Sequence, residues 1–568
     1  MKNTIPNSIK EHLKQHKLLY LSFLIFAIPF LITRLPFFLD YPVLMFDPDY
    51  LHYYMVVDQV DKGLFPTFII RSPGYPLFLK LVFTFFNSNM AVVIIQALLS
   101  FLVPLFFIYT IYRVYRQRFK YISLLAAGGL AAFVSSSIHL LSDTTLLTES
   151  LYVNSIILFF ALLIRGIHLK ENLTWVFCSL SMAAVILIRP SGMFLIVVYL
   201  ITALFLFLNS RRKKEILSFS LPVILILFLL SAYNYFTIGS FSFSAVYSEH
   251  ALISFTSTFL ETKESYPAEV NEIIEKSKKK IGPKHKKAIE YPWDITAVEE
   301  LWNIRKTNRA LRRHYNRNRN FIFASLLALE EKDSHALYLK WRPLLKDMAW
   351  TAIKKNPGIY LKYVYVNLFV YFFRNMKDVD FYEKLKGRYA RFLTPHRYYK
   401  GFLEKTIMTR VYYKKKYAAT LSKSEDFLNA FLKENRRPEK IANLDRYKQD
   451  GKWQVEIKPT FLQKLHIIYK KTHDFLFRNV LWVLGFFFVL VFSFVRLLKS
   501  RFSHSGALIL FLLTLSALMH GLIISLSSFS ILRYSYSMEF VYYLSLFLLP
   551  LILPFSPPGK KNGEKAEL

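Results

Sequence analysis

The chain has 568 residues, of which 54% are hydrophobic and 17% aromatic. A water-soluble globule of this length cannot bury so much apolar surface, so the composition indicates a membrane protein. The formal net charge of +35 does not call for a nucleic-acid partner, because basic residues of membrane proteins gather in cytoplasmic loops and at lipid headgroups.

The predicted elements begin with a polar, basic segment, residues 1–17, which we place in the cytoplasm. The apolar run at 18–39 lacks a small-residue cleavage site and is too long for a signal-peptide core, so it predicts a first membrane span. The single cysteine, Cys178, lies in an apolar run and leaves the redox compartment undecided. Further apolar runs predict spans at 90–112, 121–140, 146–164, 173–188, 192–208, 216–236, 480–498, 507–527 and 536–553.

The charge of the short connections predicts the orientation of these roughly ten spans. With the N-terminus inside, every short basic connection falls on the cytoplasmic side, as does the tail at 556–568. The basic residues concerned are Arg113, Arg116, Arg118, Lys120, Arg165, Lys170, Arg211, Arg212, Lys213, Lys214, Arg496, Lys499 and Arg501. We expect a multi-pass protein of the plasma (inner) membrane, with an endoplasmic-reticulum membrane as the alternative.

The spans fall into two groups separated by a long basic segment. Residues 18–236 form an N-terminal transmembrane module with its first outer loop at 40–89, and residues 479–555 hold the C-terminal helices. Residues 237–478 predict a mainly helical, amphipathic domain on the membrane surface. Within it, 357–373 is interrupted by Lys362 and Asn367, which favours an interfacial or re-entrant helix over a span.

Polar motifs gather on the predicted outer side. The first outer loop holds FDPDYLHYY at 46–54 and RSPGYP at 71–76, and the next outer turn carries Asp143 and Glu149. Arg189 begins the third outer turn, and Arg533 with Tyr534 lies in the last. A carboxylate able to accept a hydroxyl proton, with arginines to hold a phosphate, is the chemistry that a transferase using a lipid-phosphate donor needs.

These motifs resemble those of the GT-C membrane glycosyltransferases, in particular the group of protein O-mannosyltransferases and bacterial lipid A aminoarabinose transferases. The register is Asp49, Tyr53, Gly63 and then SPGYPLFLKL from Ser72. Later signatures follow in the same order: LLTESLY at Glu149, LIRPSG at Arg189, YNYFTIGSFSFS from Tyr233, IKKNPGIYLKY from Ile353 and ILRYSYS at Arg533. The resemblance covers 18–260 well, 349–367 loosely and 480–553 moderately, and 378–475 has no counterpart.

The resemblance implies a GT-C-like bundle of about 10–11 transmembrane helices and assigns roles to particular residues. It makes Asp49 the catalytic candidate and Glu149 the supporting carboxylate. Many relatives have a second acid directly after the catalytic Asp, whereas here Asp47 precedes Asp49 across Pro48. Either aspartate therefore stays a candidate, and Asp47 is equally suited to cap a helix.

The remaining candidates are substrate-binding residues, and each has a plainer alternative. They are Arg71, Tyr53, Arg189, Arg533 and Tyr534. Arginines at helix ends commonly reach lipid headgroups without further function, and Asp143 is held in reserve because it also suits a solvated turn or a cap.

The function predicted is transfer of a sugar from a polyprenyl-phosphate donor to a glycan, lipid or protein acceptor at the non-cytoplasmic face, with inversion. No histidine pair has metal-ligand spacing, and a divalent ion held by Asp49, Glu149 or a histidine stays an open alternative. The main competing interpretation is a transporter or flippase of a lipid-linked or anionic solute. A transporter would place polar sites at span centres, where His520 is the main candidate.

Overall fold

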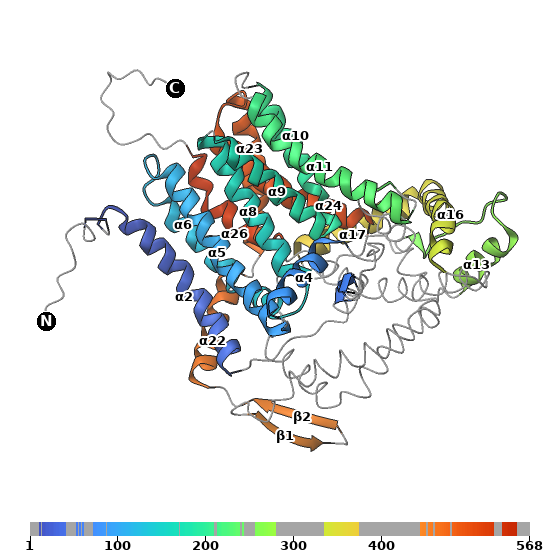
Figure 1. The fold of residues 1–568 in the computed structure, drawn as a ribbon, viewed down its shortest axis with the longest axis horizontal. Helices are drawn as coiled ribbons and strands as arrows, with labels where there is room; N and C mark the ends of the chain where they lie inside the picture. Colours follow the sequence, from blue (N-terminus) through green and yellow to red (C-terminus); the bar gives the residue numbers. More distant parts are fainter. Residues whose placement is uncertain are drawn as a thin grey trace.

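The computed structural model describes the helical bundle and parts of the long segment between its two groups of helices. Described are residues 11–12, 14–40, 53–54, 56–57, 60–61, 72–86, 88–169, 171–208, 213–238, 241–242, 256–279, 334–373, 444–449, 452–457, 460–477, 480–527 and 537–553. Figure 1 shows these elements as a bundle of helices with α13 and α16 lying to one side of it.

The N-terminal part of the bundle runs from α2 to α11. Its elements are α2 (Lys17–Asp40), α4 (Gly74–Phe86), α5 (Asn89–Tyr115), α6 (Ile122–Val134), α7 (Ser137–Asp143), α8 (Thr148–Leu169), α9 (Asn172–Ile188), the 3₁₀ helix η1 (Pro190–Phe194), α10 (Leu195–Leu208) and α11 (Lys213–Ile238).

The later part contains the helices of the long segment, a hairpin and the C-terminal helices. These are α13 (Ala268–Lys279), α16 (Ser334–Lys355), α17 (Pro357–Phe373), β1 (Leu444–Gln449), β2 (Lys452–Ile457), α22 (Phe461–Phe477), α23 (Val480–Lys499), α24 (Ser505–Ser527), α26 (Glu539–Phe547) and η4 (Leu549–Leu551). The two strands pair antiparallel, so the segment predicted to be mainly helical also holds a β-hairpin.

Seven helices among the described residues are long and apolar enough to cross a membrane. They are Lys17–Leu39, Asn89–Tyr115, Thr148–Leu169, Pro190–Leu208, Lys213–Thr237, Leu481–Lys499 and Ser505–Leu526. Three shorter apolar helices, Gly74–Phe86, Ile122–Val134 and Asn172–Ile188, accompany them. The prediction of a helical membrane protein is confirmed at this level, while the count of about ten crossings stays a prediction.

Two predicted spans are broken in the structure. The run at 121–140 divides into α6 and α7, because Ser136 adopts an extended backbone and its side chain accepts a hydrogen bond from the backbone N–H of His139. This is an N-cap, which starts a new helix instead of continuing the old one. The last run begins its helix at Glu539 and passes into η4 after Leu548.

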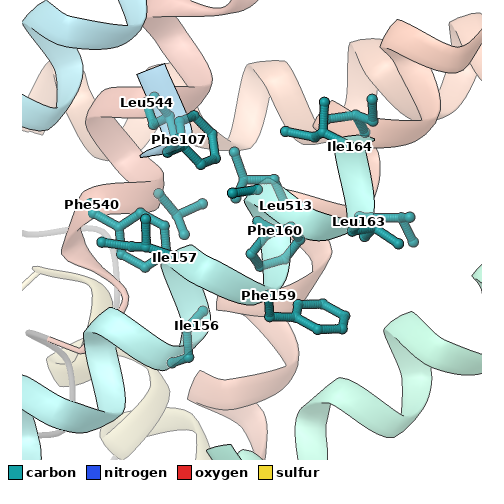
Figure 2. Close-up of a cluster of buried hydrophobic side chains, with 14 of the residues drawn as sticks. Phe107, Ile156, Ile157, Phe159, Phe160, Leu163, Ile164, Leu513, Phe540 and Leu544 are labelled. Carbon is teal, nitrogen blue, oxygen red and sulfur yellow. The ribbon is translucent and has the colours of Figure 1, made fainter. Parts of the chain in front are cut away.

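Helix α8 is the centre of the core. It packs against α5 and α9, and nearly all of its side chains are buried. Figure 2 shows its apolar residues meeting three other helices at one cluster. The labelled side chains are Ile156, Ile157, Phe159, Phe160, Leu163 and Ile164 of α8, Phe107 of α5, Leu513 of α24, and Phe540 and Leu544 of α26. Helix α11, by contrast, keeps a broad apolar face exposed, as a lipid-facing helix does.

Helix α17 connects α13 and α16 to the main bundle. Its Tyr363 and Val364 belong to a small core with α13 and α16, whereas Tyr371 and Phe372 belong to the main core. It packs along α24. The last turns of the segment that we predicted to be interfacial or re-entrant are therefore buried among helices.

Candidate functional site

The predicted site residues divide into those that the structure describes and those that it does not. Asp47, Asp49, Arg71, Arg533 and Tyr534 lie outside the described residues. Tyr53, Glu149 and Arg189 are described, and all three lie at the same end of the bundle, as the contacts below establish.

Glu149 and Arg189 form an ion pair between two helix ends. Glu149 lies in the first turn of α8, and Arg189 follows the last residue of α9 with an extended backbone. The Nη2 of Arg189 donates to Oε1 of Glu149 at 3.2 Å, and the two side chains are 12% and 3% exposed. The structure thus brings together a predicted carboxylate and a predicted phosphate ligand that are 40 residues apart in sequence.

Aromatic side chains continue from this pair into the bundle. The guanidinium of Arg189 lies 5.5 Å from the ring centre of Tyr152, whose hydroxyl contacts Oγ of Ser191 at 3.2 Å. The ring of His520 lies 6.1 Å from that of Tyr152, and its Nδ1 is 2.6 Å from the hydroxyl of Tyr371. This contact joins α17 to α24, as does the hydrogen bond from the Tyr360 hydroxyl to the backbone carbonyl of Leu526 at 2.8 Å.

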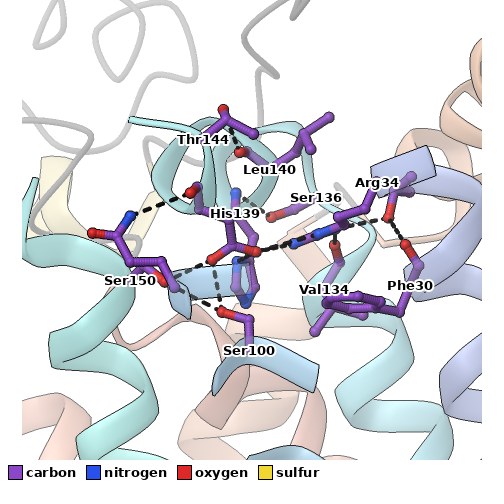
Figure 3. A network of polar contacts seen from close by, with 12 residues as sticks. Phe30, Arg34, Ser100, Val134, Ser136, His139, Leu140, Thr144 and Ser150 are labelled. Carbon is purple, nitrogen blue, oxygen red and sulfur yellow. Dashed lines mark hydrogen bonds and ion pairs between the residues drawn. The ribbon is translucent and has the colours of Figure 1, made fainter. Parts of the chain in front are cut away.

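Asp143 is the centre of a second, fully buried network. Its carboxylate accepts hydrogen bonds from Ser100 and Ser150, each at 2.7 Å, and from Nη2 of Arg34 at 2.7 Å. The Nδ1 of His139 lies 3.2 Å from the same carboxylate. In Figure 3 the labelled side chains of Arg34, Ser100, His139 and Ser150 converge on one point. The solvated turn that we considered for Asp143 is thus wrong, because its side chain is 0% exposed.

The neighbours of Asp143 keep its carboxylate ionised. Burial by itself would raise the pKa of this carboxyl, but the charges of His139 and Arg34 and the hydrogen bonds from His139 and Ser100 lower it well below the usual range. A carboxylate that stays ionised and is surrounded by donors is a poor proton acceptor. Asp143 consequently serves to join helices.

Arg34 is the residue that the sequence interpretation missed. It lies in the first apolar run, near the outer end of α2, and donates to Oγ1 of Thr33 at 2.7 Å and to the backbone carbonyl of Val134. Its presence in an apolar run was the available signal, because an ionisable residue inside a membrane helix needs a partner. The sequence gives no means of identifying that partner as Asp143.

Tyr53, in the predicted first outer loop, is packed against α4. Its side chain is buried, and its ring meets the ring of Tyr75 in α4 edge to face, with centroids 5.0 Å apart. Val56 and Val57 are buried as well. The helical residues that follow the FDPD motif, from Tyr53 on, therefore pack against α4.

The described carboxylates do not form a metal site. Within the parts of the chain that the structure describes, no group of three or more His, Cys, Asp or Glu side chains could hold an ion. Glu149 and Asp143 instead each face an arginine. The divalent ion considered at Asp49, Glu149 or a histidine stays a prediction, because Asp49 lies outside the described residues, and no step of the chemistry below uses one.

Comparison with known proteins gives no relative: no protein-family model and no curated protein matches the chain. The resemblance to the GT-C glycosyltransferases accordingly depends on the motifs quoted above.

Proposed function

We propose that the chain is a membrane glycosyltransferase that moves a sugar from a polyprenyl-phosphate donor to an acceptor hydroxyl at the non-cytoplasmic face of the plasma membrane. The observation that supports this most directly is the Glu149–Arg189 pair, a buried carboxylate and a slightly exposed guanidinium at the ends of two apolar helices. Ionisable groups at such a position are costly unless they serve a function or are paired.

Neighbouring contacts connect this pair to the first outer loop. Glu149 directly precedes Ser150, which binds the buried Asp143. Tyr53 follows Asp49 by four residues in sequence and is seated on α4. Tyr53, which belongs to the same FDPDYLHYY motif as Asp49, packs on α4, and Gly74 at the start of α4 lies against Leu187 and Ile188, next to Arg189 of the ion pair.

The proposed reaction is a single displacement. Asp49 takes the proton of the acceptor hydroxyl, the acceptor oxygen forms a bond to the anomeric carbon, and the bond from that carbon to the phosphate oxygen breaks. The electron pair leaves with the polyprenyl phosphate, and Arg189 and Arg533 stabilise its charge. A phosphate leaving group needs little help from a general acid, so one base and two cations suffice, with inversion at the anomeric carbon.

Glu149 has a supporting role in this proposal. Its ion pair with Arg189 orients the guanidinium. The donor phosphate would then compete with the Glu149 carboxylate for that guanidinium. The Tyr152 ring beneath the guanidinium limits its movement further. The long basic segment at 237–478 would cover the site and bind the acceptor.

A donor-consumption assay separates this function from the alternatives. Purified full-length protein in liposomes is given a radiolabelled polyprenyl-phosphate sugar and a crude envelope acceptor fraction. We expect label to leave the donor lipid, and we expect Glu149→Gln to slow this loss, whereas Glu171→Gln, at the exposed partner of Arg165, does not. Solute uptake without donor consumption would instead identify a transporter.

A further inference from the structure

Helix α4 packs against the helix of the first outer loop, of which residues 53–54, 56–57 and 60–61 are described and which we call the first-loop helix. It also packs against the end of α9 next to Arg189, and it reaches the turn before Glu149 through Gln96 of α5. It lies in the last part of the predicted first outer loop, 40–89, and begins at the Pro-Gly-Tyr-Pro turn. On one side Tyr75 contacts Tyr53, and the Nζ of Lys80 contacts the carboxylate of Asp61. What holds α4 itself in place is therefore what positions the first outer loop.

The first attachment of α4 is a hydrogen-bond chain through Gln96 of α5. The hydroxyl of Tyr75 donates to Oε1 of Gln96 at 3.0 Å, and Nε2 of Gln96 donates to the backbone carbonyls of Asp143 at 3.2 Å and Thr145 at 3.1 Å. Both side chains are fully buried. The amide uses both donors and its acceptor, so a single orientation satisfies it, and leaving one of these groups unpaired would cost stability.

This chain ends at the turn that leads into Glu149. Asp143 and Thr145 lie between α7 and α8, and Glu149 follows Thr145 by four residues. Gln96 thus joins the helix that supports the first outer loop to the turn that positions the second carboxylate. The connection passes through one side-chain amide.

The second attachment is a contact of Gly74 with the end of α9. A Cβ at position 74 would lie 2.7 Å from the backbone nitrogen of Ile188 and 2.7 Å from the carbonyl carbon of Leu187. These are backbone atoms, which cannot move aside as a flexible side chain can. Only glycine lets α4 approach this closely, and the next residue of the chain after Ile188 is Arg189.

We propose that Gly74, Tyr75 and Gln96 are positioning residues that fix the described residues of the first-loop helix, between Tyr53 and Asp61, relative to Glu149 and Arg189. Tyr53 follows the candidate base Asp49 by four residues in the sequence. This inference rests on the proposed function for its catalytic consequence. None of the three touches substrate; they act by placing the groups that do. A displacement of about 1 Å between a base and a bound donor can cost two orders of magnitude in rate.

The experiment combines a distance measurement with steady-state kinetics on the full-length protein in lipid nanodiscs. Spin labels are placed at Val60→Cys, a half-buried site in the first-loop helix, and at Gln117→Cys, an exposed site just after the last residue of α5. The one native cysteine, Cys178, is buried and is not labelled. The test variants are Gly74→Ala, Gln96→Leu and the milder Tyr75→Phe, which removes a single hydroxyl should Gln96→Leu fail to fold.

A matched control is available in the same chain. Gly358 in α17 is a glycine at which an added Cβ meets nothing within 4 Å, so Gly358→Ala adds the same methyl group without pushing a neighbour. We expect the distance between labels to shift or broaden in the test variants and to stay unchanged in the control.

In the kinetic arm, Gly74→Ala and Gln96→Leu should lower kcat by about tenfold or more and change KM for the donor by less than about twofold. Unchanged distances in both variants would overturn the inference, as would shifted distances with unchanged kcat. If the wild-type protein transfers no sugar, the proposed function fails, and the distance measurement alone then decides whether the three residues hold the loop.

Discussion

Arg34 and Asp143 are 109 residues apart in sequence and form an ion pair at 2.7 Å with side chains that are 2% and 0% exposed. The pair joins α2 to the turn between α7 and α8. Ser100 of α5 and Ser150 of α8 complete the shell around the carboxylate. Four helical segments are thereby fixed at the end of the bundle where the candidate site lies.

Removal of Arg34 should be strongly destabilising. Arg34→Met leaves the Asp143 carboxylate buried without its cation, and breaking a buried pair in this way costs about 3–5 kcal/mol. Thermal unfolding in detergent, followed by intrinsic fluorescence, measures the loss. As a control, Arg165→Met breaks the more exposed pair with Glu171 and should cost less than about 1 kcal/mol.

The double variant Arg34→Met with Asp143→Asn tests the cause of that loss. Because it removes both charges, it should recover part of the stability that Arg34→Met loses. Additive losses in the double variant would show that the two residues act independently and would contradict the ion-pair account.

The stability of the protein should fall as the pH falls from about 6.5 to about 4, because of His466. Burial, with the charges of Arg34 and Lys470, lowers the pKa of His466 in α22 from 6.5 to about 4. Between these two pH values the unfolded chain binds a proton at His466 that the folded chain does not. The contribution of His466 to the free energy of unfolding is therefore complete above pH 6.5 and amounts to at most roughly 3 kcal/mol. Asp143 adds no slope here, because its lowered pKa keeps it ionised.

Unfolding midpoints measured at pH 7.5, 6.0 and 5.0 test this prediction. His466→Leu should flatten the pH dependence that the wild type shows. An equal slope in wild type and His466→Leu would assign the acid sensitivity to other groups.

Arg189 should affect donor binding more than stability. Arg189→Lys keeps the charge but loses the planar fork that holds a phosphate through two donors, so we expect KM for the donor to rise about tenfold with a modest change in unfolding midpoint. Arg189→Gln should raise it further. Donor titrations of the initial transfer rate give the values, and a KM equal to that of wild type in both variants would exclude Arg189 from the phosphate site.

Gly521 should be intolerant of a side chain because Tyr371 lies against it. A Cβ at position 521 would be 2.9 Å from the Tyr371 ring, and that ring also makes the hydrogen bond to His520. Gly521→Ala should therefore loosen α17 and cost about 1–3 kcal/mol. Limited proteolysis between α16 and α17 measures the loosening, and Gly358→Ala should show none.

The general architecture was predictable from the sequence, since long apolar runs specify membrane helices almost by length alone. The break between α6 and α7 was harder to predict from the sequence, because the apolar pattern continues on both sides of the serine that caps α7. The pairing of Glu149 with Arg189 could be anticipated only as two polar residues on one predicted face.

The partners of Asp143 could not be predicted, because they depend on which helices are neighbours. Ser100 and Asn154 are ordinary residues of apolar helices in the sequence, and only packing brings both to the same network. Gln96 illustrates the same limit. Nothing in a buried glutamine of α5 indicates that it joins Tyr75 of α4 to the turn after Asp143.

The most direct test of the central claim is transfer of labelled sugar from a polyprenyl-phosphate donor by Asp49→Asn and Asp47→Asn. Each is compared with wild type and with Glu171→Gln, at the exposed partner of Arg165. If Asp49 is the base, Asp49→Asn should lower the transfer rate at least about 100-fold, while Asp47→Asn and Glu171→Gln should retain most of it. Transfer by Asp49→Asn at the wild-type rate would contradict the proposed site.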